Sequence, residues 1–426
     1  MRSAFRAECR KLTAQLATRL LFLICAVGPF AFAVLLKVQS GTPSDALFGF
    51  WVHSSGFAIS LVVLGFAGSW GFPLLAGGLA GDLFSSEDRH GTWKTIVTRG
   101  RTRRELFGGK LMAAGSFALG LLLLTTVSSL LAGTILVGDH PLIGLSGQVL
   151  SSGRTLLLTL AAWALCVLPM LAYTSLAVLF SVATRNGIIG VLGPILVALA
   201  TQLLDLIGKG VIVHLLLIGS AFDAFHGLFT AHPFFGPLIV SSLVCLIWIF
   251  ATLTAAWRLL ARRDFLGPSA APGRSWRTPV RAVAIATVVI ALLALACNLG
   301  PTGVTDTRVR ATLTPEFRRL TLLQQREIGH VIPRSASLDI IPNCNRHATR
   351  AVGPGDWTCT LDVYILEPGH LPLTQTPVEY DVSVEYNGCY KAQSPPAFVG
   401  GQTITDTSGR QVTNPLFVVY GCFNIL

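Results

Sequence analysis

The residue patterns that would support catalysis or nucleotide binding are missing from this sequence. A phosphate-binding loop needs the rigid spacing G-x-x-x-x-G-K-[ST], and the nearest fragments, at residues 109–111 and 208–210, lack both the hydroxyl residue and the spacing. The nine histidines show neither H-x-x-x-H nor H-E-x-x-H spacing, so no metal site is expected. No G-x-S-x-G nucleophile elbow occurs. We therefore expect that the chain is not an enzyme and binds no cofactor itself.

The most informative charged stretch is residues 82–110, DLFSSEDRHGTWKTIVTRGRTRRELFGGK. It joins two apolar runs and has an acidic first part, a short apolar helix expected from Trp93 to Val97, and a basic second part. Its candidate functional residues are Glu87, Arg89, Gly91, Thr92, Arg103, Arg104 and Lys110. A plain connecting loop would also be basic, but an amphipathic turn between two spans is suited to docking against a soluble partner.

The elements that must position this loop are predicted to be membrane helices. The 426 residues are 52% hydrophobic and only 12% charged, whereas about 25% of the residues in a soluble domain are charged. Mean hydropathy is +0.63. A bilayer is crossed by a helix of about 20 apolar residues. The candidate spans are residues 20–36, 56–80, 111–137, 155–182, 187–206, 237–260 and 279–299.

The net charge of +11 indicates how these spans are oriented. Lys and Arg cluster at 2–19, 89–110 and 258–281, each cluster beside an apolar run. The positive-inside rule places all three in the cytoplasm. Seven crossings of the plasma membrane then put the N-terminus inside and the C-terminus outside, whereas six would put basic loops on the wrong face. Membrane lipid is the expected contact of these charges, and nucleic acid is not expected as a partner.

Three smaller segments carry their own predictions. Residues 1–19 are interpreted as an amphipathic helix in the cytoplasmic interface, with a frayed N-terminus as the alternative. No cleavable signal peptide is evident, and residues 20–36 are interpreted as a retained span. Residues 207–236 are too apolar for an open loop and suggest short helices that enter the outer leaflet. Asp205 near the end of the fifth span is expected to pair with Lys209.

Residues 300–426 differ in character from the rest. They hold 11 of the 21 acidic residues, and in EYDVSVEY apolar and polar residues alternate as in a half-buried strand. A helix is expected from Thr314, with Pro315 at its first position. We predict a small, β-rich, extracytoplasmic domain at 300–426, preceded at 267–299 by a cytoplasmic linker and the seventh span.

The cysteines of this last domain form an even-numbered set: Cys344, Cys359, Cys389 and Cys422. Disulfides persist outside the cytoplasm, and no C-x-x-C pair suggests zinc instead. Four cysteines allow three pairings. Cys344–Cys359 and Cys389–Cys422 are favoured because each closes a short loop around a turn.

Several short motifs resemble those of ABC-2 type permease subunits, the class that includes antibiotic and natural-product exporters. The family pattern Glu…Gly-Thr…basic cluster…Gly-Lys between spans two and three is matched by Glu87, Gly91-Thr92, Arg103-Arg104 and Gly109-Lys110. The family's N-terminal Glu-x-x-Lys motif is matched by Glu8 and Lys11. The family's sixth span ends in a basic cluster followed by Asp, which is matched by Arg262, Arg263 and Asp264. The resemblance covers about residues 1–266, with the six-span permease core at 20–266. The seventh span and last domain depart from the six-span family pattern.

This resemblance implies an exporter permease. Two permeases, identical or related, would pair, and separate cytoplasmic ATPase subunits carrying ATP and Mg would act through the loop and the N-terminal helix. An amphipathic or hydrophobic substrate would leave toward the outside. The predicted fold is an all-α membrane bundle of six spans plus one, with the small β-rich domain. The alternative function is a membrane-anchored sensor or envelope-assembly protein whose last domain binds a ligand.

Overall fold

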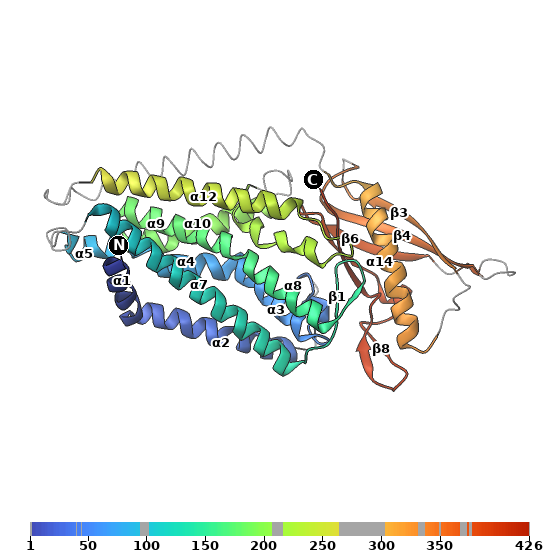
Figure 1. Ribbon diagram of the computed structural model, residues 1–426. Helices are drawn as coiled ribbons and strands as arrows, with labels where there is room; N and C mark the ends of the chain where they lie inside the picture. Colours follow the sequence, from blue (N-terminus) through green and yellow to red (C-terminus); the bar gives the residue numbers. More distant parts are fainter. Residues whose placement is uncertain are drawn as a thin grey trace.

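The computed structural model consists of a long helical bundle and a sheet domain at one end of it (Figure 1). The structure describes residues 2–39, 41–43, 45–93, 102–206, 216–263, 303–330, 337–348, 351–366, 373–374 and 377–425. We call the two ends of the bundle the α1 end and the sheet end.

The bundle begins with α1 (Arg2–Ala14), which lies across one end, and the chain turns at Gln15, in extended conformation, into α2 (Leu16–Val38) (Figure 1). The remaining long helices are α3 (Gly56–Phe66), continued by π-helical η2 (Ala67–Gly71) and α4 (Phe72–Ala80), then α7 (Arg103–Leu136), α8 (Ser152–Leu165), α9 (Val167–Thr184), α10 (Gly187–Leu206) and α12 (Gly236–Ala261). The short helix α5 (Ser85–Arg89) follows α4 at the α1 end.

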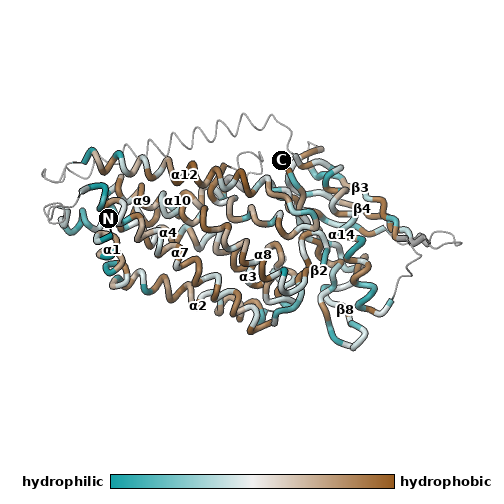
Figure 2. The backbone as a smooth tube through the Cα atoms, in the orientation of Figure 1, coloured by the Kyte–Doolittle hydropathy of each residue, from teal (hydrophilic) through white to brown (hydrophobic). Residues whose placement is uncertain are grey.

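Among the described residues, five helical stretches are long and apolar enough to cross a membrane: 16–38, 56–89, 103–136, 152–184 and 236–261. A shorter apolar helix covers 187–203. These stretches overlap the first six expected spans, whereas 279–299 lies outside the described residues. Large apolar side chains stay exposed on α2 and α12, including Leu35 (67%) and Phe250 (76%), and Figure 2 shows the hydrophobic character of the bundle. Such a surface is stable against lipid, which confirms a multi-pass membrane bundle.

Close helix approach depends on glycine. A Cβ atom added at Gly190 would lie 2.0 Å from the Gly81 carbonyl oxygen, so α10 and the end of α4 meet backbone to backbone. Gly56 and Gly133 bring α3 and α7 together in the same way, with 2.1 Å between a Cβ at Gly133 and the Gly56 oxygen. Membrane helices pack through small residues because lipid supplies no hydrophobic force between them.

The connections at the sheet end are short ordered elements. They are η1 (Gly49–Trp51), the hairpin of β1 (Leu142–Ile143) and β2 (Val149–Leu150), η3 (Gly219–Phe222) and η4 (Ala224–Phe229). The two last elements lie in the described part of the apolar segment 207–236, and Phe222 and Phe225 are buried there. The expected Asp205–Lys209 pair lies outside the described side chains. Residues 94–97 of the expected loop helix also lie outside the described residues, whereas Trp93 at its start is described.

The sheet domain is an antiparallel sheet with a helix packed on one face. The sheet order is β10-β7-β6-β4-β3, with β5 beside β4. The elements are α14 (Asp306–Glu327), β3 (Ser337–Arg346), β4 (Gly355–Leu366), β5 (Leu373–Thr374), β6 (Val378–Val384), β7 (Cys389–Gln393), α15 (Pro396–Val399), the hairpin β8 (Thr403–Thr405) and β9 (Gln411–Thr413), and β10 (Val418–Cys422). The predicted β-rich domain is therefore confirmed.

The alternation in β6 works as predicted. Tyr380 and Val382 are buried on one face, and Asp381 and Ser383 are exposed on the other. The buried face packs against α14, where the Phe317 and Tyr380 rings lie 5.9 Å apart edge to face. Period-two patterning thus identified both the strand and its core side.

The prediction of a helix beginning at Thr314 is wrong. The helix α14 begins eight residues earlier, where the Thr305 hydroxyl accepts a hydrogen bond from the Arg308 amide, and Pro315 lies inside it. A proline inside a helix removes one backbone hydrogen bond. The apolar face of α14, including Leu313 and Phe317, is buried on the sheet and keeps the helix continuous.

The domain contains two disulfides, one in its core and one on the face toward the bundle, and one buried polar pair. Cys344–Cys359 joins β3 to β4 and Cys389–Cys422 joins β7 to β10, which is the favoured pairing. Between α14 and the sheet, the Tyr390 hydroxyl donates to the Glu316 carboxyl, and both side chains are buried.

The sheet domain contacts the bundle through the loop between α2 and α3, which we call the α2–α3 loop (residues 39–55). The Phe50 amide donates to the Tyr420 hydroxyl over 3.2 Å, and the Phe50 and Phe417 rings stack 5.9 Å apart. The Lys391 ammonium lies 2.7 Å from the Asp45 carboxylate. On α14, Arg319 donates to the Ser146 carbonyl oxygen between β1 and β2 over 2.7 Å. The sheet domain therefore rests on the bundle through aromatic packing, hydrogen bonds at two places and a surface ion pair.

Candidate functional site

The candidate site is built around a lysine buried at the α1 end. Lys110 lies on α7 with its side chain 1% exposed. Its ammonium lies 2.9 Å from the Glu8 carboxylate on α1 and 3.1 Å from the Glu87 carboxylate on α5. It also donates to the Leu83 carbonyl oxygen over 3.0 Å and lies 5.6 Å from the centre of the Phe84 ring. These contacts satisfy the donors of a charge that would be costly to bury alone.

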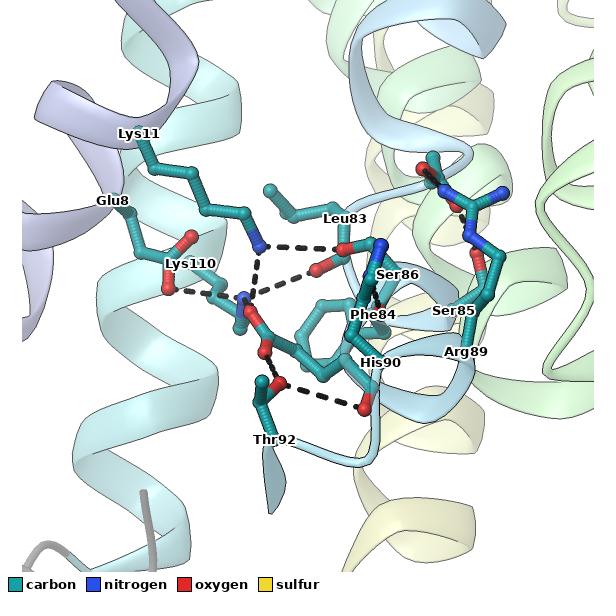
Figure 3. A network of polar contacts seen from close by, with 12 residues as sticks. Glu8, Lys11, Leu83, Phe84, Ser85, Ser86, Arg89, His90, Thr92 and Lys110 are labelled. Atoms are coloured by element: carbon teal, nitrogen blue, oxygen red, sulfur yellow. Dashed lines mark hydrogen bonds and ion pairs between the residues drawn. The ribbon is translucent and has the colours of Figure 1, made fainter. Parts of the chain in front are cut away.

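Figure 3 shows the polar network that surrounds Lys110 and Lys11. Glu87 is its shared acceptor. Its Oε1 accepts from Lys11 over 2.6 Å as well as from Lys110, and its Oε2 accepts from the Thr92 hydroxyl. Lys11 also donates to the Ser86 hydroxyl over 3.2 Å. We call Glu8, Lys11, Ser86, Glu87, Thr92 and Lys110 the Lys110 cluster.

The Lys110 cluster joins helices that are distant in sequence. Glu8 and Lys11 are on α1, Glu87 is on α5, and Lys110 is on α7. Two carboxylates and two ammonium groups balance one another, so the cluster carries no net charge. Removing one partner of a buried pair leaves an uncompensated charge, which costs about 3–5 kcal/mol. The cluster therefore fixes how α1 lies on the bundle.

A second ion pair ties α5 to the end of α12. The Arg263 guanidinium contacts both oxygens of Asp88, with Nη1 2.9 Å from Oδ2. Its guanidinium carbon lies 5.8 Å from the centre of the Trp93 ring. The guanidinium thus combines a bidentate pair with a cation–π contact. Through Arg263, the loop after α4 contacts the last described helix of the bundle.

Arg89 is oriented away from the Lys110 cluster. Its guanidinium lies 2.7 Å from the Asp82 carboxylate, and the Asp82 Oδ1 accepts from the Ser85 hydroxyl over 2.8 Å (Figure 3). The Ser181 hydroxyl on α9 accepts from the Ser85 amide over 3.1 Å at the start of α5. A side-chain acceptor at a helix start satisfies an otherwise unpaired amide.

The start of α7 is fixed by a capping box. The Thr102 hydroxyl accepts from the Glu105 amide over 3.3 Å, and the Glu105 carboxylate accepts from the Thr102 amide over 3.1 Å. Arg103 donates to the Ala261 carbonyl oxygen at the end of α12. Arg104 is exposed. The two neighbouring arginines therefore have different surroundings, one packed on α12 and one on the surface.

Two glycines of the predicted loop pattern have a structural reason. Gly91 has φ +63°, a backbone conformation that other residues adopt at a cost, and it directs the chain from α5 back to Thr92. At Gly109, an added Cβ atom would lie 2.7 Å from the Cβ of Ala4. Glycine at this position lets α1 approach α7 closely enough for Glu8 to reach Lys110.

The sequence pattern and the structure can be compared residue by residue. Five of the predicted site residues lie together in the Lys110 cluster: Glu8, Lys11, Glu87, Thr92 and Lys110. Arg89, Arg103 and Arg104 do not belong to it. Sequence reasoning missed Asp82, Ser86, Asp88 and Trp93, whose contacts depend on the fold. The adjacent acidic pair Glu87–Asp88 was the available signal.

The α1–α5–α7 arrangement belongs to the part of the chain that matches a known family. Residues 4–193 match the model of the ABC-2 family transporter proteins. These residues form an ABC-2 transporter permease domain. The match includes every member of the Lys110 cluster and ends within α10. No curated protein matches the chain. The ABC-2 permease domain is a membrane component and not itself catalytic, in agreement with a site made of structural ion pairs.

Proposed function

We propose that this ABC-2 permease is the membrane subunit of an ATP-driven exporter, and that a separate ATPase chain docks on the α1 end. The observation that carries the proposal is the Lys110 cluster, which connects α1, α5 and α7 at that end. ATP and Mg belong to the ATPase subunit, and the permease chain binds neither. The permease pairs with a second permease, either another copy or a related chain.

The surface around the cluster supports docking of an acidic partner surface. Several arginines are exposed at or near this end, namely Arg6, Arg10, Arg89, Arg104 and Arg262. Charge complementarity speeds association and selects the correct partner. The exposed arginines are the docking groups of this proposal, and the buried cluster is the element that receives the movement.

Movement would pass from the docked ATPase into the bundle through the buried charges. Separating Lys110 from its carboxylates is costly, so a displacement of α1 or α5 moves α7 with it. The Asp88–Arg263 pair extends this connection to α12. The α1 end is therefore suited to move as one rigid unit when the ATPase moves.

The proposed direction of transport is outward, and the proposed orientation has a cytoplasmic α1 end. The basic clusters favour a cytoplasmic α1 end, and the two disulfides favour an extracytoplasmic sheet domain. Arg263 lies at the α1 end, whereas Val304 lies in the core of the sheet domain. The two flanks of 264–302 thus lie at opposite ends, which supports the proposed seventh span and the division into 1–19, 20–266, 267–299 and 300–426. The substrate class we propose is amphipathic or hydrophobic.

The decisive experiment is reconstitution of the permease in proteoliposomes with and without a candidate ATPase. We expect background hydrolysis by the permease alone and transport only when both are present. Substantial hydrolysis by the lone chain would contradict the proposal.

The coupling surface is tested by Arg104→Glu, with Arg154→Glu as the control at an exposed arginine of the sheet end. Arg104→Glu should weaken ATPase binding about tenfold, because it reverses one docking charge while the buried cluster stays intact. Arg154→Glu should bind the ATPase normally. Normal coupling by Arg104→Glu would show that the loop is only a solvated connection.

A further inference from the structure

A pocket of about 590 Å³ lies between the sheet domain and the α2–α3 loop. This volume falls within the range of small-molecule sites, about 300–1,000 Å³. The lining side chains that matter for its chemistry are Asp45, Asp356, Asp381, Ser383, Lys391 and Gln393. They come from the loop and from three neighbouring strands, β4, β6 and β7.

Strand register places these polar side chains on one face of the sheet. Ser383 lies opposite Asp356 on one side and opposite Lys391 on the other. In the next row, Asp381 lies opposite Gln393. Asp356 and Asp381 are then diagonal neighbours on adjacent strands, a relation that separates residues by about 7–8 Å. The opposite face of the sheet is covered by α14.

The same face is the one that β10 turns toward the bundle. Tyr420 pairs with Lys391 in register, so both side chains share this face. The Tyr420 hydroxyl accepts a hydrogen bond from the Phe50 amide, and Lys391 contacts Asp45. Phe50 and Asp45 both belong to the α2–α3 loop. The loop therefore forms a second wall, and the pocket is built by two parts of the chain.

The charge of the pocket is negative. Asp45 meets Lys391, and Asp356, Asp381 and Glu385 add three further carboxylates to the lining. In the described part of the chain, no group of three His, Cys, Asp or Glu side chains is placed to hold a metal ion. The carboxylates are spread along the pocket, so they match separated positive charges better than a single ion.

We propose that this pocket binds a soluble organic cation that carries two or more amino groups spaced along a flexible chain. The carboxylates of Asp356 and Asp381 accept from separate ammonium groups, and the Ser383 hydroxyl and Gln393 amide supply hydrogen bonds between them. The Asp45–Lys391 pair lies where the pocket meets the α2–α3 loop. The site does not depend on the proposed export function, because binding requires neither ATP nor a partner chain.

The test is calorimetric titration of spermidine into the full-length, oxidised permease in nanodiscs. We expect saturable binding with one site per chain. The double variant Asp356→Asn/Asp381→Asn should bind spermidine about tenfold more weakly or worse, since each substitution removes a charged acceptor. The matched control is Glu379→Gln, an exposed carboxylate on the same strand and face as Asp381 but outside the pocket lining. It should bind spermidine normally, and all variants should keep the unfolding temperature of the parent protein.

Three outcomes would overturn the proposal. The first is the absence of saturable binding. The second is an equal loss of affinity in Glu379→Gln, which would show a diffuse attraction to the acidic face. The third is loss of spermidine binding only in nanodiscs that contain phosphatidylethanolamine, which would assign the pocket to a lipid amine instead of a soluble cation.

Discussion

The two ends of the bundle are held together by different physical means. At the α1 end, Lys110 is 1% exposed and is compensated by buried carboxylates from two other helices. At the sheet end, the contact includes a ring stack, a hydrogen bond to Tyr420, a hydrogen bond from Arg319 to the Ser146 carbonyl oxygen, and an ion pair whose Asp45 side chain is 97% exposed. A buried charge cluster depends on every member, whereas contacts of the second kind contribute in small, separate amounts. The α1 end is thus suited to transmit movement as a unit, and the sheet end to adjust.

The largest effect is expected at the α1 end. Lys110→Met should destabilise the bundle by about 3–5 kcal/mol, because the Glu8 carboxylate loses its cation and Glu87 keeps only Lys11. The measurement is denaturant unfolding in detergent. The control is Lys37→Met, which removes an exposed ammonium that donates to the Leu136 carbonyl oxygen over 2.6 Å, and a change near zero is expected. Equal stability of the two variants would remove the distinction between the ends.

The next effect concerns the covalent bridges of the sheet domain. Removing Cys389–Cys422, with 33 residues of sequence separation, should cost about 4 kcal/mol, and removing Cys344–Cys359, with 15, about 3 kcal/mol. Limited proteolysis of the paired Ala variants measures both. The first loss should also loosen the contact with the bundle, because β7 and β10 carry Lys391 and Tyr420. If neither variant is cleaved faster than the parent, the bridges do not stabilise the domain.

A smaller effect is expected for the buried hydrogen bond at the sheet end. Tyr420→Phe leaves the Phe50 amide without its acceptor, which should cost about 1–3 kcal/mol. Hydrogen exchange at Phe50 should accelerate accordingly. Tyr364→Phe, at the far end of β4, is the control and should leave this amide unchanged. Unchanged exchange in Tyr420→Phe would mean that this hydrogen bond does not help to hold the domain on the bundle.

The smallest effect is expected for the surface ion pair. Asp45→Asn should change stability by less than about 1 kcal/mol, because the carboxylate is almost fully exposed and salt screens the pair. Unfolding temperatures of parent and variant should converge as salt rises to about 0.5 M. A large, salt-independent loss of stability in Asp45→Asn would show that this ion pair matters as much as the Lys110 cluster.

The sequence predicted the elements that depend on local pattern. Apolar runs located the five long apolar stretches and the shorter apolar helix at 187–203, alternation located β6, and short loops favoured the observed disulfide pairing. The start of α14 was misplaced because Thr314-Pro315 has the composition of a helix start, and packing of Leu313 and Phe317 on the sheet overrode that local signal.

The site was predictable only as a set of motifs. Glu8 and Lys110 are separated by about a hundred residues, and nothing in their spacing shows that they meet. Glu8 reaches Lys110 because α1 approaches α7 closely at Gly109, and that approach is a property of the folded bundle. The contact of Tyr420 with Phe50 was missed for the same reason, since it depends on how two separate parts of the chain dock.

The buried Glu316–Tyr390 pair makes the sheet domain sensitive to proton concentration. Burial raises the pKa of Glu316 well above its ordinary value, and unfolding returns it to about 4.3. The folded domain therefore keeps a proton that the unfolded chain releases. This contribution to stability is complete below about pH 4.3 and is lost as pH rises toward the folded pKa. Asp406, whose pKa is lowered to about 2, mainly by a hydrogen bond from Ser408, titrates below the working range. Burial also raises the pKa of Glu327 on the same helix. Unfolding temperatures from pH 5 to 8 should therefore fall in the parent protein and fall less steeply in Glu316→Gln, so that acid tightens this domain and alkali loosens it.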